Sequence, residues 1–411
     1  MKRIYFPIGV AAVFVALACV NIHFLAGFVG DERRYSSAAW EIFSGGPETN
    51  LEHPLLAKSI QGFFAALFVF LKLDPLIGMR VASMAAGAGV LIGTYVIAAR
   101  FVSREAAVLS ALLLFSNSLF LVHSRLISPE MVSLCFLVFG IYYFLIDQLA
   151  YEPSALALAS AFLGLSMSAK WVGIWLIPWV LIRLVSAREV GRAFKFLSVL
   201  LLFYAIGNCA YFLNHAVSDA VPWQRWAFGY HQTSAAISVY NGSRAWTWFV
   251  IPQHLYYARL MPSAHSAEMV LGTINPVVFV LVLPALWMGV RQWRRQSVGL
   301  LLAEAAVCLY VPWIFVPRPT YFFYALTLLP VLCILEGMLL MGVWEKQKFL
   351  VKAVVGCAFA IFTLFYPAAT GLRISNGYER TLSAFNFYKR PVFDSMFCQK
   401  CNLYFGESRN P

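Results

Sequence analysis

Two neighbouring carboxylates, Asp31 and Glu32, directly follow the first apolar run and are the residues best suited to chemistry. A carboxylate that is partly withdrawn from water has a raised pKa and can take the proton from an attacking hydroxyl. We therefore predict that one of the two is a general base and that the other hydrogen-bonds the structure around it. The alternative is that they cap and begin a helix through Tyr35 to Phe43, because carboxylates favour helix N-termini.

The same polar stretch closes with residues that can hold an anion. Glu52, His53, Pro54 and Lys58 precede the next apolar run, and Pro54 suits a helix start. His53 and Lys58 together supply cations for an anionic headgroup, although each alone is also explained as a cap or as a snorkelling side chain. A metal site from Asp31, Glu52 and His53 is disfavoured, because no second His follows at i+3 or i+4.

Further charged residues interrupt later apolar runs. Arg125 stands five residues before Glu130 in a short connection. An Arg side chain binds phosphate better than Lys does, because its planar guanidinium can donate two parallel hydrogen bonds. A simple connecting loop explains the pair as well. Lys170 precedes Trp171 and is a second candidate cation or an interfacial anchor. Arg318 lies between two prolines, which fix the backbone around this cation.

The composition places these residues in a membrane protein. The chain has 411 residues, of which 61% are hydrophobic and 12% charged, whereas soluble proteins carry about 25% charged residues. The net charge of +12 is explained by Lys and Arg beside apolar runs rather than by nucleic-acid binding. Six of the eight cysteines fall in apolar runs. The other two, Cys398 and Cys401, form a disulfide or half of a metal site, and the disulfide is predicted because no second pair accompanies them.

The apolar runs predict about eleven membrane crossings and hence an all-α, polytopic protein. They cover about residues 4–29, 77–101, 105–123, 131–150, 154–170, 171–187, 196–213, 269–290, 298–316, 320–343 and 349–368. A short apolar helix at about 59–73 is predicted to lie along the interface, because the later Lys and Arg clusters then fall on one side. The short runs 154–170 and 171–187 are alternatively a hairpin entering from outside.

This topology collects the polar segments on the outer face and suggests four parts. They are a catalytic membrane module at 1–213 with an outer loop at 30–76, an outer loop for acceptor or sugar recognition at 214–268, membrane helices at 269–368 and an outer tail at 369–411. Aromatic residues interleaved with His, Asn and Arg in the second loop suit sugar recognition. Many of them are equally explained as interfacial anchors.

The polar residues, taken in order, resemble the protein O-mannosyltransferase family of the GT-C superfamily. The motifs that carry the resemblance are Asp31-Glu32, His53-Pro54 with Lys58, Arg125 with an acid five residues later, Ser168-Ala169-Lys170-Trp171-Val172-Gly173, Leu271-Gly272 with Asn275-Pro276, and Pro312-Trp313 followed by Arg318, Phe322, Phe323 and Tyr324. Two departures are Leu55-Leu56-Ala57 in place of Pro-Leu-Gly, and Glu130 in place of the usual Asp. The outer loop is too short for a MIR domain, which indicates a bacterial-type member.

The resemblance implies an inverting enzyme that moves mannose from polyprenyl- or dolichyl-phosphate-mannose to Ser or Thr hydroxyls of a translocated protein. No metal or other cofactor is expected. Asp31 would be the catalytic base and Glu32 its partner, with Lys170 and Arg318 near the lipid phosphate. The full set of expected substrate-binding residues is His53, Lys58, Arg125, Glu130, Lys170, Arg318 and Tyr324.

The resemblance also implies an integral protein of a bacterial inner or plasma membrane with its active site on the outer face. Two alternatives remain open at this point. A sister branch of the superfamily transfers aminoarabinose to lipid A and has a similar acid-first loop. A polyprenyl-lipid flippase or other transporter would also be apolar and basic.

Overall fold

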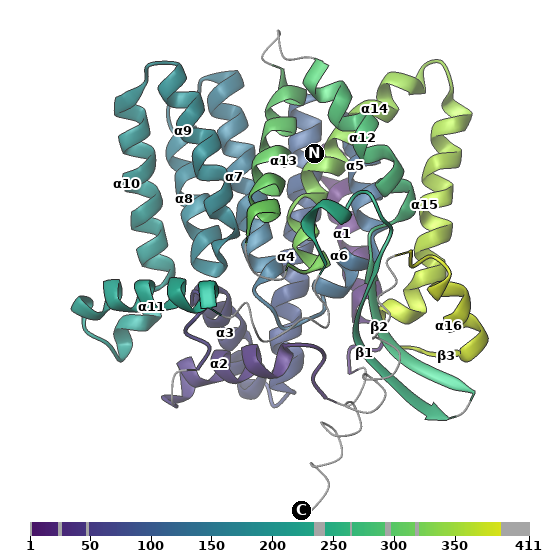
Figure 1. Cartoon of the computed structure of the whole chain (residues 1–411), viewed down its shortest axis with the longest axis horizontal. Helices are drawn as coiled ribbons and strands as arrows, with labels where there is room; N and C mark the ends of the chain where they lie inside the picture. Colours follow the sequence, from purple (N-terminus) through teal and green to yellow (C-terminus); the bar gives the residue numbers. More distant parts are fainter. Residues whose placement is uncertain are drawn as a thin grey trace, which may run out of the picture.

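Long apolar helices make up the body of the protein. A computed structural model describes residues 2–23, 27–46, 49–233, 243–263, 265–291, 297–316 and 320–387. The predicted site residue Arg318 and the predicted disulfide of Cys398 and Cys401 lie outside the described residues. The helices of the body run side by side (Figure 1) and are α1 (Lys2–Cys19), α4 (Pro75–Phe101), α5 (Arg104–Phe115), α6 (Ser118–His123), α7 (Glu130–Ala150), α8 (Ala155–Ala169), α9 (Ile177–Ser186), α10 (Val190–Gly207), α12 (Pro276–Arg291), α13 (Val298–Phe315), α14 (Leu329–Trp344) and α15 (Lys348–Ala369).

Within the described ranges, five helices are long and apolar enough to cross a membrane: α4, α7, α10, α13 and α15. Six apolar segments are shorter, and they include the N-terminal helix and the helix that we expected at the interface, α3 (Leu56–Phe70). The mostly helical, multi-pass architecture is confirmed. The count of eleven crossings stays a prediction, because a helix of 10 to 17 residues can cross, lie at the interface or enter partway.

A second group of elements gathers at one end of the bundle, shown at the bottom of Figure 1. It contains α2 (Glu32–Ser44), α3, α11 (Ala220–Thr233), α16 (Asn376–Ser383) and a small sheet. The α7–α8, α9–α10 and α14–α15 connections lie at the opposite end. The two ends therefore differ as the charge pattern predicts: the polar loops lie at one end, and the α9–α10 and α14–α15 connections, which contain Arg188 and Lys346, lie at the other.

The sheet is a feature that the sequence analysis did not predict. Strands β1 (His254–Ser263), β2 (Ser266–Thr273) and β3 (Arg373–Ser375) pair antiparallel in the order β1-β2-β3. The predicted crossing at 269–290 begins as β2, and its helix starts only at Pro276. Alternate side chains of β2, Ala267, Met269 and Leu271, are buried in a small apolar cluster, as expected for a half-buried strand.

Another predicted crossing, at 105–123, is broken into α5 and α6 at Asn117. The Asn117 side chain donates to the Leu113 carbonyl oxygen at 2.7 Å and accepts from the backbone N–H of Asn275 at 2.8 Å. The break therefore joins α6 to the junction between β2 and α12. Short 3-10 segments likewise interrupt other predicted crossings, at Trp171–Leu176, Cys209–Leu213 and Phe322–Thr327; two further ones, Val217–Asp219 and Ala245–Thr247, flank α11.

Close packing fixes α2 and α3 as a platform at the polar end. A Cβ added at Gly62 of α3 would lie 2.4 Å from the carbonyl oxygen of Ala39 in α2. Because real Cβ atoms do not approach an oxygen so closely, only glycine permits this spacing. The helix that begins with Glu32 is thereby held against its neighbour.

The separation of the two ends can be tested by cysteine labelling. We expect cysteines introduced at Tyr151, after α7, and at Val217, after α10, to react with an impermeant maleimide from opposite sides of the membrane. Both side chains are exposed, and the native cysteines are replaced in the parent. Labelling of both positions from the same side would contradict the arrangement.

Candidate active site at the start of α2

The turn that presents the two acids begins at Gly30. Its φ of +56° lies in the left-handed region, which favours glycine. Asp31 follows at the N-cap position of α2, yet its side chain makes no capping hydrogen bond. The helix-cap explanation of Asp31 therefore lacks the contact on which it depends.

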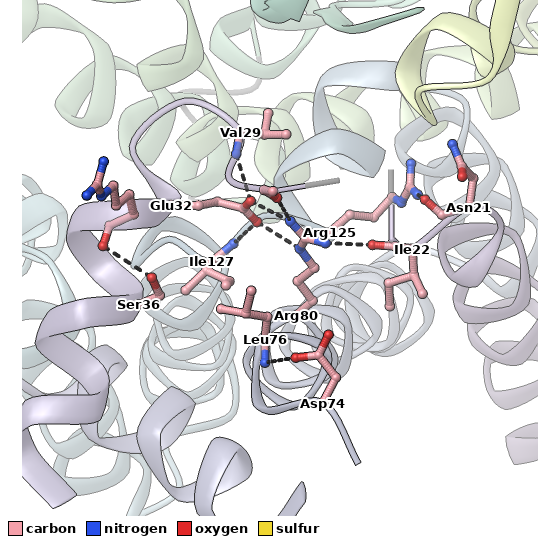
Figure 2. A network of polar contacts seen from close by, with 12 residues as sticks. Asn21, Ile22, Val29, Glu32, Ser36, Asp74, Leu76, Arg80, Arg125 and Ile127 are labelled. Atoms are coloured by element: carbon pink, nitrogen blue, oxygen red, sulfur yellow. Dashed lines mark hydrogen bonds and ion pairs between the residues drawn. The ribbon is translucent and has the colours of Figure 1, made fainter. Parts of the chain in front are cut away.

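Glu32 is engaged in a buried ion pair (Figure 2). Its carboxylate accepts from Arg80 of α4 through Nε at 3.0 Å and Nη2 at 2.6 Å, and both side chains are buried. It also accepts from the backbone N–H groups of Val29 at 2.9 Å and Ile127 at 3.0 Å. One carboxylate thus joins α4 to the segments before α2 and before α7.

Asp31 has a different environment. The residue is exposed, and neighbouring protein atoms replace part of the water around its carboxylate. This partial desolvation raises its pKa, Glu130 raises it further, and Arg34 and Lys170 act in the opposite direction. A carboxylate with a raised pKa is a better proton acceptor than free aspartate.

Beside Asp31 lies a buried ion pair between two other predicted residues. The Lys170 ammonium, at the end of α8, contacts the carboxylate of Glu130, at the start of α7. Lys170 Nζ also lies 5.2 Å from the ring centre of Phe323 and 5.1 Å from that of Tyr324. The second Glu130 oxygen, Oε2, has no hydrogen-bond partner among the described residues. The fold therefore brings Asp31, Glu130, Lys170 and Tyr324 to one place.

Two predicted cations contact backbone carbonyls. Lys58 Nζ donates to the carbonyl oxygens of Asn50 at 2.6 Å and His53 at 2.9 Å. Arg125 donates to the carbonyl oxygen of Ala18 at 2.8 Å and to that of Val20 at 2.6 Å, and is fully buried. We interpret both as supports of the site rather than as ligands for a headgroup.

His53 lies at the rim of the site. Its ring centre is 5.7 Å from that of Tyr35 and 5.1 Å from that of His231 in α11. His231 in turn contacts the carbonyl oxygen of Glu52 at 2.8 Å. The first outer loop is thus attached to α11 through His53 and Glu52.

Two site residues were missed by the sequence analysis or not distinguished from others. His123 ends α6 and contacts the hydroxyl of Tyr257 in β1, with 2.5 Å between Nε2 and Oη. His123 resembled the end of an apolar run, and Tyr257 was one of many aromatic residues in the outer loop. In the sequence, the signal that could have identified His123 was a histidine at the end of an apolar run. In the described ranges, no three His, Cys, Asp or Glu side chains are grouped as metal ligands.

Comparisons with known proteins bear on the fold and on the family resemblance. The family model of dolichyl-phosphate-mannose-protein mannosyltransferases matches residues 52–211. ArnT from Cupriavidus metallidurans bound to undecaprenyl phosphate is similar over 88% of this chain and 77% of its own, with 17% identity and a TM-score of 0.60. The S. cerevisiae protein O-mannosyltransferase Pmt1-Pmt2 complex bound to the sugar donor covers 90% of both chains, with 12% identity and a TM-score of 0.73.

A more distant likeness is to the archaeal oligosaccharyltransferase AglB from Archaeoglobus fulgidus, in complex with an inhibitory peptide and a dolichol-phosphate. It covers 89% of this chain and 54% of that one, with 12% identity and a TM-score of 0.50. No curated protein matches the chain. At these identities the solved structures show the fold, which is that of the GT-C glycosyltransferases. The resemblance to the mannosyltransferase family is confirmed over the matched residues.

The hydrogen bonds and the ion pair of Glu32 predict that Glu32→Gln lowers the stability of the folded protein. The substitution leaves the Arg80 charge buried without its counter-charge, which costs about 3–5 kcal/mol. We expect a clearly lower thermal unfolding midpoint in detergent. Glu41→Gln is the matched control, at a partly exposed position of the same helix where the side-chain oxygen accepts from Thr49 and Gln can still accept; it should leave the midpoint near that of the parent. A Glu32→Gln protein as stable as the parent would contradict this role.

Proposed function

We propose that this GT-C glycosyltransferase moves mannose from a polyprenyl- or dolichyl-phosphate-mannose donor to Ser or Thr hydroxyls of translocated proteins. The observation that carries the proposal is the contrast between the two acids of the first loop. Glu32 is bound by Arg80 and two backbone N–H groups, whereas Asp31 makes no capping bond and lies beside the Lys170–Glu130 pair. The name of the matching family supports the choice of sugar and donor.

The proposed reaction is a single displacement with inversion. The acceptor hydroxyl oxygen forms a bond to the anomeric carbon while the bond from that carbon to the phosphate oxygen breaks. The hydroxyl proton passes to Asp31, and the bond electrons leave with the lipid phosphate. One base on the side opposite the leaving group is sufficient for this chemistry.

Lys170 is the proposed partner of the leaving phosphate. Negative charge grows on that phosphate as the bond breaks, and a fixed cation in a water-poor site stabilises it. Glu130 holds the ammonium in place through the buried ion pair, and the faces of Phe323 and Tyr324 restrict it further. Since Lys170 supplies this charge stabilisation, the mechanism requires no metal ion.

The remaining proposed contacts lie around this centre. His53 at the rim and Tyr324 beside Lys170 are proposed to contact the donor or the acceptor, and Arg318 is proposed to lie near the lipid phosphate. The site is proposed to face the outer side of a bacterial inner or plasma membrane. In the labelling experiment above, position 217 should then react from outside.

The Asp31→Asn substitution distinguishes a role of Asp31 as general base from a role as helix cap. The amide keeps the size of the side chain but removes its basicity, so turnover should fall by roughly 10² to 10⁴ while the unfolding midpoint and donor affinity stay near those of the parent. Glu41→Gln is again the control. Near-normal turnover of folded Asp31→Asn protein would end the case for Asp31 as the base.

The pH profile of the parent enzyme checks the same assignment. Asp31 acts as a base only when deprotonated, and its pKa is raised above the ordinary 3.8. The value of kcat/KM should therefore fall as the pH is lowered through a pKa higher than that of free aspartate. An acidic limb at or below the pKa of free aspartate would contradict the desolvated site.

A donor assay tests the substrate class. Purified protein is incubated with labelled polyprenyl-phosphate-mannose, GDP-mannose or another polyprenyl-phosphate sugar, together with a Ser/Thr-containing peptide or a lipid acceptor. We expect transfer to the peptide from polyprenyl-phosphate-mannose alone. Transfer directly from GDP-mannose would contradict the proposal, and transfer only to the lipid acceptor would favour the aminoarabinose-transferase-like alternative.

A further inference from the structure

A buried contact between α6 and β1 lies directly behind the proposed base. His123 is 2% exposed and Tyr257 half-buried, and the ring centres are 5.3 Å apart at an interplanar angle of 83°. Their polar atoms meet at 2.5 Å. These elements are 134 residues apart in the sequence, so the contact joins the membrane body to the small sheet.

The ring of Tyr257 is wedged between two glycines. A Cβ added at Gly30 would lie 3.6 Å from Cδ1 of this ring, and one added at Gly272 of β2 would lie 3.2 Å from Cε2. Gly30 holds the left-handed turn that immediately precedes Asp31. The tyrosine therefore packs against the backbone that presents the proposed base.

A hydrogen bond ties the Tyr257 hydroxyl to the His123 ring, and the imidazole tautomer decides which of the two atoms donates. His123 Nδ1 is buried without a partner in the described part of the chain. The bond through Nε2 is therefore the polar contact of this ring, and it holds the tyrosine in either tautomer. Burial, with added repulsion from Glu130 and Asp31, raises the pKa of Tyr257 well above its ordinary value, so the phenol stays protonated.

We propose that Tyr257, held in place by His123, is a positioning residue that fixes the Gly30 turn and thereby the carboxylate of Asp31. The proposal rests on the proposed function, because it assumes that Asp31 is the base. Neither residue needs to touch the reacting atoms. Misplacement of a reacting group by about 1 Å can lower the rate by about 10²-fold, so a lost anchor behind the base has a measurable effect.

The test is a double-mutant cycle between Tyr257→Phe and Asp31→Asn. Tyr257→Phe keeps the ring between the glycines but removes the bond to His123. We expect it to lower kcat by about 10- to 100-fold, with donor KM within twofold of the parent and an unchanged unfolding midpoint. In the Asp31→Asn background the same change should cause no further loss, because its effect passes through Asp31. His123→Leu removes the bond from the other partner and should behave in the same way.

The matched control is Tyr256→Phe. Tyr256 is the neighbouring tyrosine of β1, but it packs with the sheet cluster and its hydroxyl lies 3.4 Å from that of Ser383 in α16. Its kcat should stay within twofold of the parent.

The outcomes separate the two proposals. Losses that multiply in the double mutant, or an unchanged kcat in Tyr257→Phe, would overturn the positioning role. If Asp31→Asn alone left turnover intact, the proposed base itself would fail. If Tyr257→Phe protein were unstable, His123→Leu would carry the same cycle.

Discussion

The candidate active site depends on the burial of one ion pair, Glu32 with Arg80. An ionised carboxylate is stable away from water only when it is paired and hydrogen-bonded, and Glu32 satisfies both conditions with Arg80, Val29 and Ile127. These contacts occupy both oxygens of the Glu32 carboxylate. The exposed neighbour Asp31 is the one proposed to take the proton. Two adjacent acids can thus have different tasks because their surroundings differ.

The cations divide in a similar way. Lys58 and Arg125 donate hydrogen bonds to backbone carbonyl oxygens of the segments before α3 and at the end of α1, which helps to satisfy main-chain acceptors there. Lys170 instead pairs with a side chain, and it follows the end of α8 in extended backbone. The charge of a side chain alone does not identify a ligand-binding residue in a membrane protein. The groups that the side chain contacts are more informative, because a cation bound to main-chain carbonyls stabilises the fold.

The sequence predicted the helical membrane class and brought Asp31, Glu130, Lys170 and Tyr324 forward as site residues, because charges between apolar runs are few and costly there. It did not identify Arg80, which lies inside a long apolar helix, nor His123. The sheet was missed because Met269 to Leu271 of β2 lead into the apolar segment of α12, and hydropathy does not distinguish a short buried strand from the start of a helix. The break at Asn117 depends on Asn275, a partner distant in sequence, and no local pattern reports such a contact.

The hydrogen bond from Ile127 to Glu32 has a consequence for the acceptor. Ile127 belongs to the connection that ends at Glu130, so the first outer loop and the residue that holds Lys170 are fixed to the same carboxylate. The proposed base and the proposed leaving-group cation are therefore linked through one buried carboxylate. Under the proposed function, we expect the conformational adjustment to fall on the acceptor polypeptide. We expect such an enzyme to act most readily on segments that have not yet folded, because ordering a flexible segment costs less free energy than opening a packed one.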